Sequence, residues 1–380
     1  MSKREVWITG IGLVSSLGEG TETHVAALGG VTPSVDGERF APHRLHPAVP
    51  LAWEQQIPKK ADQRQMEAWQ KLGVYAAGLA LADAGLKDDK ERLGRMELVV
   101  AAGGGERDYV VDGQILTGLP TANDAGAFLN ERLMNDLRPT LFLAQLSNLL
   151  AGNISIVHGV TGGTRTFMGE EQAGVDAVRI AAARIAAGQG DTFLVGGAYN
   201  AERPDILLIY EMGGFLWAHD FASVWDRPGH GGGFIPGSGA AFLVLEAADT
   251  AGARGARPLA RLDAVAADLT RRAPGSVDRS LARLWAQVSP GAPRSKGAIL
   301  SGATGVVGIT EEERGALARL AQGVRVYATG DLIGHMLEAQ FPAGLALAAA
   351  ALAAGSFEEA TVTSVGHTRG EGLARITRIT

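Results

Sequence analysis

Two neighbouring acids, Glu170 and Glu171, stand at the start of a segment with helical spacing, "EQAGVDAVRIAAARIAAG". Paired carboxylates in a pocket suit general acid–base chemistry, in which one group accepts a proton and the other donates one. The free N–H groups and the dipole at a helix start also favour negative charge there, by ~0.3–1 kcal/mol. The two acids therefore admit both a catalytic and a helix-capping interpretation.

Histidines offer little further chemistry at the level of spacing. His335, in "GDLIGHMLEAQFPAG", follows a glycine near the start of a helix rich in small residues. A lone histidine in that setting is more often a structural hydrogen-bonding residue than a catalytic one. Asp226, Arg227 and His230 in "VWDRPGHGGG" indicate loop charges. No histidine or carboxylate cluster has the spacing of metal ligands, so we expect no metal.

Glycine makes up 52 of the 380 residues, which is about 14% and roughly twice the usual share. Its clusters at 103–105 and 229–239 invite a phosphate-loop interpretation. No Gly-Lys-Ser/Thr follows either cluster, and neither opens a helix after a strand as a dinucleotide motif must. These glycines predict tight turns and close packing, and we expect no cofactor.

Composition excludes several classes of protein. The net charge of -6 and the pI near 5.8 argue against a nucleic-acid binder, which needs a basic surface. The absence of cysteine excludes disulfides, thiolate metal sites and cysteine nucleophiles. The apolar run at 341–355 is short and rich in alanine, which favours a buried helix over a membrane span. The first residues lack the features of a secretory signal, so we expect a cytoplasmic location.

The elements that would hold the acids alternate between strand and helix, which predicts a mostly parallel α/β sheet. The pattern recurs on both sides of a Gly/Ala/Arg stretch, so we expect two related halves, 1–247 and 258–380, with a linker at 248–257. Strands are expected at 6–9, 96–105, 191–197, within 232–268, and at 298–302 and 324–328; helices are expected at 61–86, 138–160, 172–187, 311–321 and 341–355.

Six segments in order resemble the β-ketoacyl-acyl carrier protein synthases. "VWITGIGLVSSLG" is similar to the family's opening V-x-T-G-x-G-x-V-S-x-x-G, and "NLLAGNISIVHGVTGG" to its N-x-x-A-G-x-I-S-I-x-x-G-x-x-G. "WDRPGHGGGFIPGSGAAFLVLE" and "GDLIGHMLEAQFPAG" resemble later motifs, and the matches run from residue 3 to about 371. The resemblance implies a thiolase-like duplicated α/β fold of five αβαβα layers, working as a dimer.

In this family a cysteine nucleophile begins the buried central helix. The family's spacings are twelve residues from the preceding glycine, here Gly159, and seventeen back from the glycine that ends the helix, here Gly188; both counts reach Glu171. The resemblance thus implies that Glu171 stands at the nucleophile's position. Ala303 stands for the first catalytic histidine, Gly330 for the lysine, and only the second histidine remains, as His335. The family's gating G-F-G-G becomes "GHTR".

One branch of the family, the chain-length factors of type II polyketide synthases, including those making aryl polyenes, has lost the same residues. Its motif reads S/A-E-Q-A-G-G-L-D-A with glutamine at the cysteine position, against "EEQAGVDA" here. The helix spacing favours Glu171 at the lost nucleophile, whereas the motif favours Gln172 with a one-residue deletion. Both remain open, and we favour Glu171 in space with Gln172 as the motif's counterpart.

The branch implies a non-catalytic subunit that heterodimerises with an active ketosynthase and shapes the tunnel for a growing chain. Acyl carrier protein would bind through the complex. The helix after "VVAAGGG" lines the tunnel in family members, although each of its residues fits an ordinary interface helix equally well. The tunnel candidates are Tyr109, Asp112, Gly113 and Leu116.

Two enzymatic alternatives remain. One is a malonyl-carrier-protein decarboxylase, which normally keeps both histidines, so that Ala303 counts against it. The other is a divergent thiolase-fold acyl enzyme that uses Glu171 as a base with His335. Since a single histidine cannot replace a thiolate and two bases, we expect no condensation by this chain alone.

Overall fold

The computed structural model describes residues 3–289 and 296–379. Its strands run through both halves of the chain and join one hydrogen-bonded sheet path. They are β1 (Val6–Ser15), β2 (Gly18–Glu19), β3 (Glu97–Ala101), β4 (Thr164–Phe167), β5 (Thr192–Tyr199), β6 (Gly239–Ala247), β7 (Ala260–Asp268), β8 (Gly297–Ser301), β9 (Arg325–Ala328), β10 (Glu359–Val365) and β11 (Glu371–Thr377).

Helices separate most of these strands in the sequence. They are α1 (Thr21–Ala27), α2 (Lys60–Gln65), α3 (Ala68–Asp83), α4 (Lys90–Arg95), α5 (Tyr109–Gly118), α6 (Ala125–Asn135), α7 (Leu141–Ala144), α8 (Leu149–His158), α9 (Glu171–Ala186), α10 (Pro204–Met212), α11 (Ala248–Ala253), α12 (Ser276–Val288), α13 (Ile309–Leu320), α14 (Thr329–Ile333) and α15 (Gln340–Ala353). Short 3-10 turns are η1 (Trp53–Gln55), η2 (Leu119–Thr121), η3 (Arg227–His230) and η4 (Leu337–Ala339).

The strand order shows an internal duplication. The path runs β4-β3-β5-β6-β1 and continues as β7-β11-β10-β8-β9, with β2 paired to β1 alone. Leaving β2 aside, each half read inward from its free edge has the order third, second, fourth, fifth, first. The directions also agree: β3 is parallel to β4 and β5, as β8 is to β9 and β10, while β6 and β11 are antiparallel to their neighbours. The predicted duplicated α/β fold is confirmed. The expectation of a mostly parallel sheet is wrong, because the pairs in the middle of the path, from β5–β6 to β11–β10, are antiparallel and the sheet is mixed.

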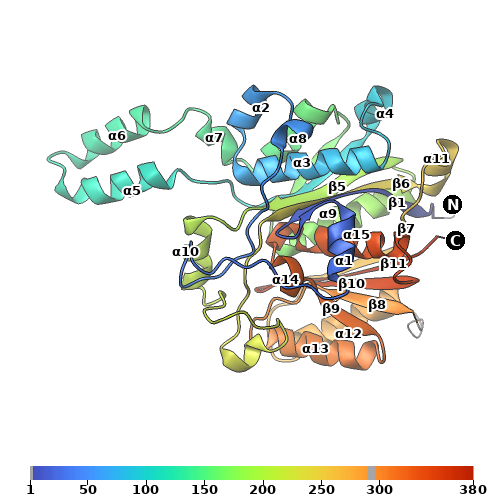
Figure 1. Ribbon diagram of the computed structural model, residues 1–380. Helices are drawn as coiled ribbons and strands as arrows, with labels where there is room; N and C mark the ends of the chain where they lie inside the picture. The colour runs from blue at the N-terminus through green and yellow to red at the C-terminus, as the bar shows by residue number, and fades with distance from the viewer. Residues whose placement is uncertain (1–2, 290–295, 380) are drawn as a thin grey trace.

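The layers follow from the helices between the strands. The two halves of the sheet face each other with α9 and α15 between them, while α3 and α8 cover one outer face and α12 and α13 the other (Figure 1). The central α15 is almost entirely apolar, and its residues from Gln340 to Leu352 are buried. A helix that is apolar all round belongs in such a middle layer. The expected five-layer, thiolase-like arrangement is therefore present.

Three expected elements differ in detail. The helix expected at 61–86 is divided because Met66 is extended and Glu67 starts α3 with a capping box. The helix expected at 138–160 forms α7 and α8, and between them Ser147 Oγ donates to the carbonyl of Gly103 at 2.7 Å. The stretch expected as a linker at 248–257 contains α11, since its alanines favour helix.

Residues 109–135, comprising α5, η2 and α6 and called the arm below, extend away from the layered body (Figure 1). Only Val111 is buried in α5, and α6 has no buried residue. The elements of the arm contact mainly one another. The body therefore contributes little to holding the arm. An isolated helix of this length is marginal in water.

Within the described residues, no helix is both long and apolar enough to cross a membrane.

Candidate functional site

The site is built at the turn between β4 and α9. After Phe167 the chain turns through Gly169, with a φ of 133°, and Glu170, with a φ of 57°. A non-glycine residue at such a positive φ costs about 1–3 kcal/mol and is found where the surroundings hold it. The turn sends the next side chain inward, so that Glu171, the first residue of α9, is only 1% exposed.

Three donors converge on a single oxygen of that side chain. Glu171 Oε1 accepts from His335 Nε2 at 2.7 Å and from His367 Nδ1 at 2.8 Å. The backbone N–H of His367 also donates to Oε1, at 3.2 Å. Because an ionised carboxylate can only accept, each imidazole must carry a proton on the nitrogen that faces it. The contacts therefore fix the protonated nitrogen of both rings.

The charges in the cluster support one another. Burial by itself raises the pKa of Glu171, but the hydrogen bonds from His335 and His367 outweigh it and hold that pKa well below its usual range. Burial lowers the pKa of His367, yet the bond to Glu171 and the nearby carboxylates raise it overall. The start of α9 adds a favourable field for the anion. Both pKa shifts favour the charged forms, a carboxylate on Glu171 and an imidazolium on His367.

Aromatic rings enclose the two histidines. The His367 ring lies 4.7 Å from Phe215, 5.4 Å from Tyr210 and 5.6 Å from Phe234, centroid to centroid. Phe234 also lies 4.9 Å from His335. Such rings exclude water, and the low local dielectric strengthens the hydrogen bonds they enclose. We call Glu171, His335, His367 and these three rings the closed pocket.

Ala303 and Gly330, the expected places of the first histidine and the lysine, lie side by side. A Cβ built on Gly330 would be 3.2 Å from Val224 Cγ2 and 3.4 Å from the carbonyl oxygen of Ala303. Val224 and Ala303 belong to one apolar cluster. Asp331 fixes the loop over them, because it accepts from Ser223 Oγ and the N–H of Val224 at 2.7 Å each. Ala303 and Gly330 therefore lie in apolar packing, and their correspondence to a histidine and a lysine stays a prediction.

Gln172 does not enter the closed pocket. Its Nε2 donates to Asp176 Oδ2 at 3.1 Å, one turn along α9, and its side chain lies against Gly370. Of the two residues that the sequence left open, Glu171 faces the histidines. Its correspondence to a lost nucleophile stays a prediction.

Glu338, in η4, is a buried acid that the sequence analysis did not single out. Burial raises its pKa to about 7, and the charges of Glu171 and Glu170 add to the shift. Its Oε1 lies 2.6 Å from where a Cβ on Gly103 would stand. The nearby Tyr199 hydroxyl is buried and has no hydrogen-bond partner among the residues that the structure describes.

Neither Glu338 nor His367 could be singled out by local pattern. His367 lies in the segment "GHTR", where the resemblance implies a gate, and is 196 residues from Glu171. Glu338 stands three residues after His335 in the segment "GDLIGHMLEAQFPAG". An acid inside the apolar run "HMLEAQF" was the one available signal, because burying an ionisable group is costly without a specific arrangement.

Glu170, Glu171 and His367 could each offer a metal one ligand atom, and these atoms lie within 4.8 Å of one another. Such a group is not expected from the sequence, because residues 171 and 367 lie far apart in the chain. Glu171 Oε1 already accepts three hydrogen bonds, and Glu170 accepts one from Thr368 Oγ1 at 3.2 Å. The donors around the carboxylates thus provide the charge balance that a cation would supply.

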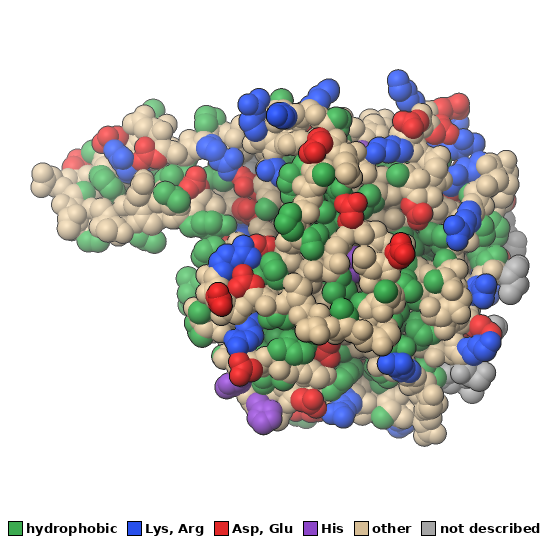
Figure 2. All heavy atoms as spheres, in the orientation of Figure 1, with side chains coloured by type: hydrophobic (Ala, Val, Ile, Leu, Met, Phe, Trp, Pro, Cys, Tyr) green, Lys and Arg blue, Asp and Glu red, His purple; other side chains and the backbone are tan. Residues whose placement is uncertain are grey.

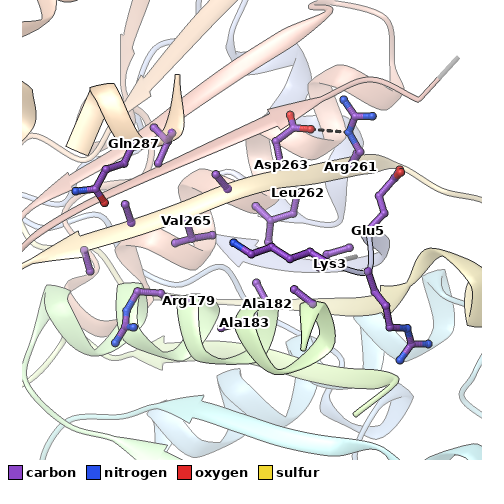
Figure 3. A pocket seen from close by; sticks show the side chains of 17 residues that line it. Lys3, Glu5, Arg179, Ala182, Ala183, Arg261, Leu262, Asp263, Val265 and Gln287 are labelled. Atoms are coloured by element: carbon purple, nitrogen blue, oxygen red, sulfur yellow. Dashed lines mark hydrogen bonds and ion pairs between the residues drawn. The ribbon is translucent and has the colours of Figure 1, made fainter. Parts of the chain in front are cut away.

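A groove of about 740 Å³ lies elsewhere, along the second half of α9 and the facing strand β7 (Figure 3). Arg179, Ala182 and Ala183 line one side, and Arg261 and Val265 line the other. At a rise of about 1.5 Å per residue, Arg179 is roughly 12 Å along the helix from Glu171. The groove and the closed pocket are separate features.

The four tunnel candidates lie on α5, away from the closed pocket. Leu116 is 72% exposed and Tyr109 is 37% exposed. Asp112 accepts from Arg107 Nε at 2.6 Å, and Gly113 has open space around it. Their role in lining a tunnel stays a prediction.

Comparison with known proteins agrees with this architecture. The β-ketoacyl synthase N-terminal domain matches residues 3–251. The 3-oxoacyl-[acyl-carrier-protein] synthase 2 of Vibrio cholerae is 29% identical over 271 residues, covering 68% of this chain and 61% of that protein. The tetracenomycin polyketide synthase ketoacyl synthase beta subunit of Streptomyces glaucescens is 31% identical over 261 residues, covering 66% and 60%. The chain thus matches about three fifths of the length of these relatives.

Among solved structures, the ishigamide ketosynthase/chain length factor superposes with a TM-score of 0.81 at 20% identity, covering 100% of both chains. At that identity the likeness concerns the fold.

Proposed function

Because the chain belongs to the β-ketoacyl synthase family, we propose that it is a non-catalytic chain-length factor that pairs with an active ketosynthase. In that role it contributes part of the tunnel for a growing polyketide or polyene chain. Acyl carrier protein then reaches it through the complex. The observation that carries the proposal is the closed pocket, in which Glu171 occupies the head of α9 and accepts from both histidines.

Condensation needs a nucleophile to hold the acyl chain and bases to drive decarboxylation. The chain has no cysteine, and Ala303 and Gly330 lie in apolar packing under Val224. The alternatives in which Glu171 or His335 performs acyl chemistry need substrate to reach them. Both side chains are at most 2% exposed and already bind each other, which favours the non-catalytic role.

Exposed apolar groups support the pairing. In the arm, Leu116 is 72% and Met134 is 74% exposed, and Figure 2 shows hydrophobic side chains along this projection. Strand β4 forms a free sheet edge among the described strands, with Thr164 and Arg165 exposed. A free edge and uncovered apolar side chains are surfaces that another subunit covers.

Co-expression with a ketosynthase tests the proposal. A stable one-to-one complex and poor behaviour alone are expected, with elongation mostly intact in a complex that carries Glu171→Ala. Replacing Tyr109 or Leu116 by a bulkier or smaller residue should shift product length. A stable homodimer that decarboxylates malonyl carrier protein, and loses this activity on Glu171→Ala, would contradict the proposal.

A further inference from the structure

The donors around Glu171 form a receptor for a carboxylate, whichever residue supplies it. Oε1 accepts from two imidazole nitrogens at 2.7 and 2.8 Å and from a backbone N–H at 3.2 Å. These donors come from α14–η4 and from the turn between β10 and β11, far from α9 in sequence. Their positions are set by those elements, so they remain converged when the carboxylate of α9 is removed.

The surroundings hold this receptor in shape. His335 and His367 are 1% and 3% exposed, and the rings of Tyr210, Phe215 and Phe234 surround them at 4.7–5.6 Å. Closely packed aromatic rings relax only partly when a neighbour is truncated, so a cavity of the removed atoms' shape remains. Polar groups line that cavity on one side, which suits an anion with a small apolar tail.

We propose that the head of α9 is a carboxylate-binding site whose ligand in the native chain is the chain's own Glu171, and that removing this side chain opens the site to free acetate. Glu171→Ala deletes a CH2–COO⁻ group, and acetate, CH3–COO⁻, replaces it atom for atom. The inference rests on the donor geometry alone and holds whether or not the chain is a chain-length factor.

One neighbouring group competes with acetate. Glu170 Oε1 lies 3.5 Å from His367 Nε2, and its partly exposed side chain is tied down by Thr368. In Glu171→Ala, Glu170 can turn toward the vacated donors. The variant Glu170→Gln/Glu171→Ala removes this competitor and should bind acetate more tightly. Glu338, the other buried acid beside the site, is unchanged in both variants.

The test is calorimetric titration of Glu171→Ala and of the double variant with sodium acetate at constant ionic strength. Saturable binding is expected in both, with acetamide at least tenfold weaker because it lacks the charge. Acetate at ten times its Kd should favour the folded state about elevenfold, which thermal unfolding measures. The native chain and the matched control Glu170→Gln, which keeps Glu171, should show neither effect.

His367→Phe placed in the double variant keeps a ring in the aromatic enclosure but removes the Nδ1 donor and leaves only the backbone N–H at this position, so acetate binding should be lost. If Glu171→Ala does not stay folded in chloride, refolding yield is compared in acetate, acetamide and chloride, and recovery in acetate alone is expected. Folded variants that bind no acetate, or that respond equally to acetamide, overturn the proposal, as does an equal response of the native chain. Elongation by the complex with ketosynthase is not read in this experiment, so failure of the proposed function leaves the result intact.

Discussion

The closed pocket and the arm place their polar and apolar side chains in opposite ways. In the pocket, the charged groups of Glu171 and His367 lie inside and bind each other. In the arm, Leu116 and Met134 point into solvent. An enzyme needs reactive polar groups that substrate can reach, whereas this chain has turned its polar cluster inward. This difference is what the proposed non-catalytic role predicts, with a pocket that stabilises the chain itself and an arm that packs against a partner.

The charges of the arm strengthen this contrast. Asp108 and Asp124 accept from backbone N–H groups and cap α5 and α6. Asp112 pairs with Arg107 just before α5, and Arg132 pairs with Glu131 in the arm and with Asp136 just after it. With its charges used locally, the arm offers mainly apolar contacts. Substitutions in the pocket should therefore change unfolding, and substitutions in the arm should change assembly.

The largest expected effect comes from breaking the pocket. His335→Ala leaves the Glu171 carboxylate with one imidazole in a buried site, and removing one partner of a buried pair costs about 3–5 kcal/mol. Urea denaturation should show this loss in the free energy of unfolding. The exposed His219 serves as the control, and His219→Ala should stay within about 0.5 kcal/mol of the native chain. Equal losses of unfolding free energy in His335→Ala and His219→Ala would show that the buried cluster adds no stability beyond that of an exposed histidine.

The next effect depends on pH. Burial raises the pKa of Glu338 from 4.5 to about 7, so between these values the folded chain holds a proton that the unfolded chain has released. Native stability therefore falls as pH rises through this window. Glu338→Gln removes the dependence and should gain up to roughly 3 kcal/mol above pH 7, with little change near pH 4.5.

Denaturation at pH 5 and pH 8 measures the difference between the two proteins. His367, whose pKa is raised, contributes stability that is lost as pH rises through that raised value, but it does so in both proteins and cancels. Parallel pH curves for the native chain and Glu338→Gln would contradict the prediction.

A smaller effect is expected from the arm. Leu116→Asp with Met134→Asp places charge where we propose a ketosynthase packs, and affinity for that partner should fall at least tenfold, or about 1.4 kcal/mol. The free energy of unfolding should change by no more than about 0.5 kcal/mol. Leu269→Asp is a matched control, since Leu269 is 62% exposed and lies just after β7. Loss of stability with unchanged affinity would reverse the roles assigned to the two regions.

The smallest effect is expected at Gly330, the position that the resemblance assigns to the family's lysine. Gly330→Ala brings a Cβ to 3.2 Å from Val224 Cγ2, a tight contact that the gain from replacing glycine in a helix offsets. Its unfolding free energy should stay within about 1 kcal/mol of the native value. By comparison, Gly174→Ala would place Cβ 2.5 Å from the carbonyl oxygen of Glu338 and should destabilise the chain clearly.

Sequence could locate the head of α9 because geometry constrains its spacing. Gly159 and Gly188, the two counting points, both take positive φ, at 74° and 69°, and end the helices α8 and α9. Such positions favour glycine, so the two glycines are reliable reference points for counting residues to the start of α9. The fold was accessible for a similar reason, since strand and helix patterns repeat in both halves.

Contacts between residues far apart in the sequence could not be predicted in this way. His367 reaches Glu171 only after β10 and β11 have paired, and nothing within several residues of His367 indicates the contact. The exposure of the arm was hidden as well, because the apolar residues of α5, in "YVVDGQILTG", are those of a helix that packs against other elements. What a helical face covers depends on tertiary placement, which periodicity does not contain.

The place of β1 in the sheet has a consequence for the order in which the molecule can be made. This strand, complete by Ser15, pairs with β6 at Gly239–Ala247 and with the first residues of β7. A ribosome adding about 5–20 residues per second needs roughly 12–50 s to reach those partners. Contacts of such long sequence separation slow folding, and during that interval an apolar strand is paired only with the two residues of β2. The duplicated sheet thus makes the first strand synthesised one of the last to be enclosed, and the nascent chain most exposed to aggregation before its second half begins.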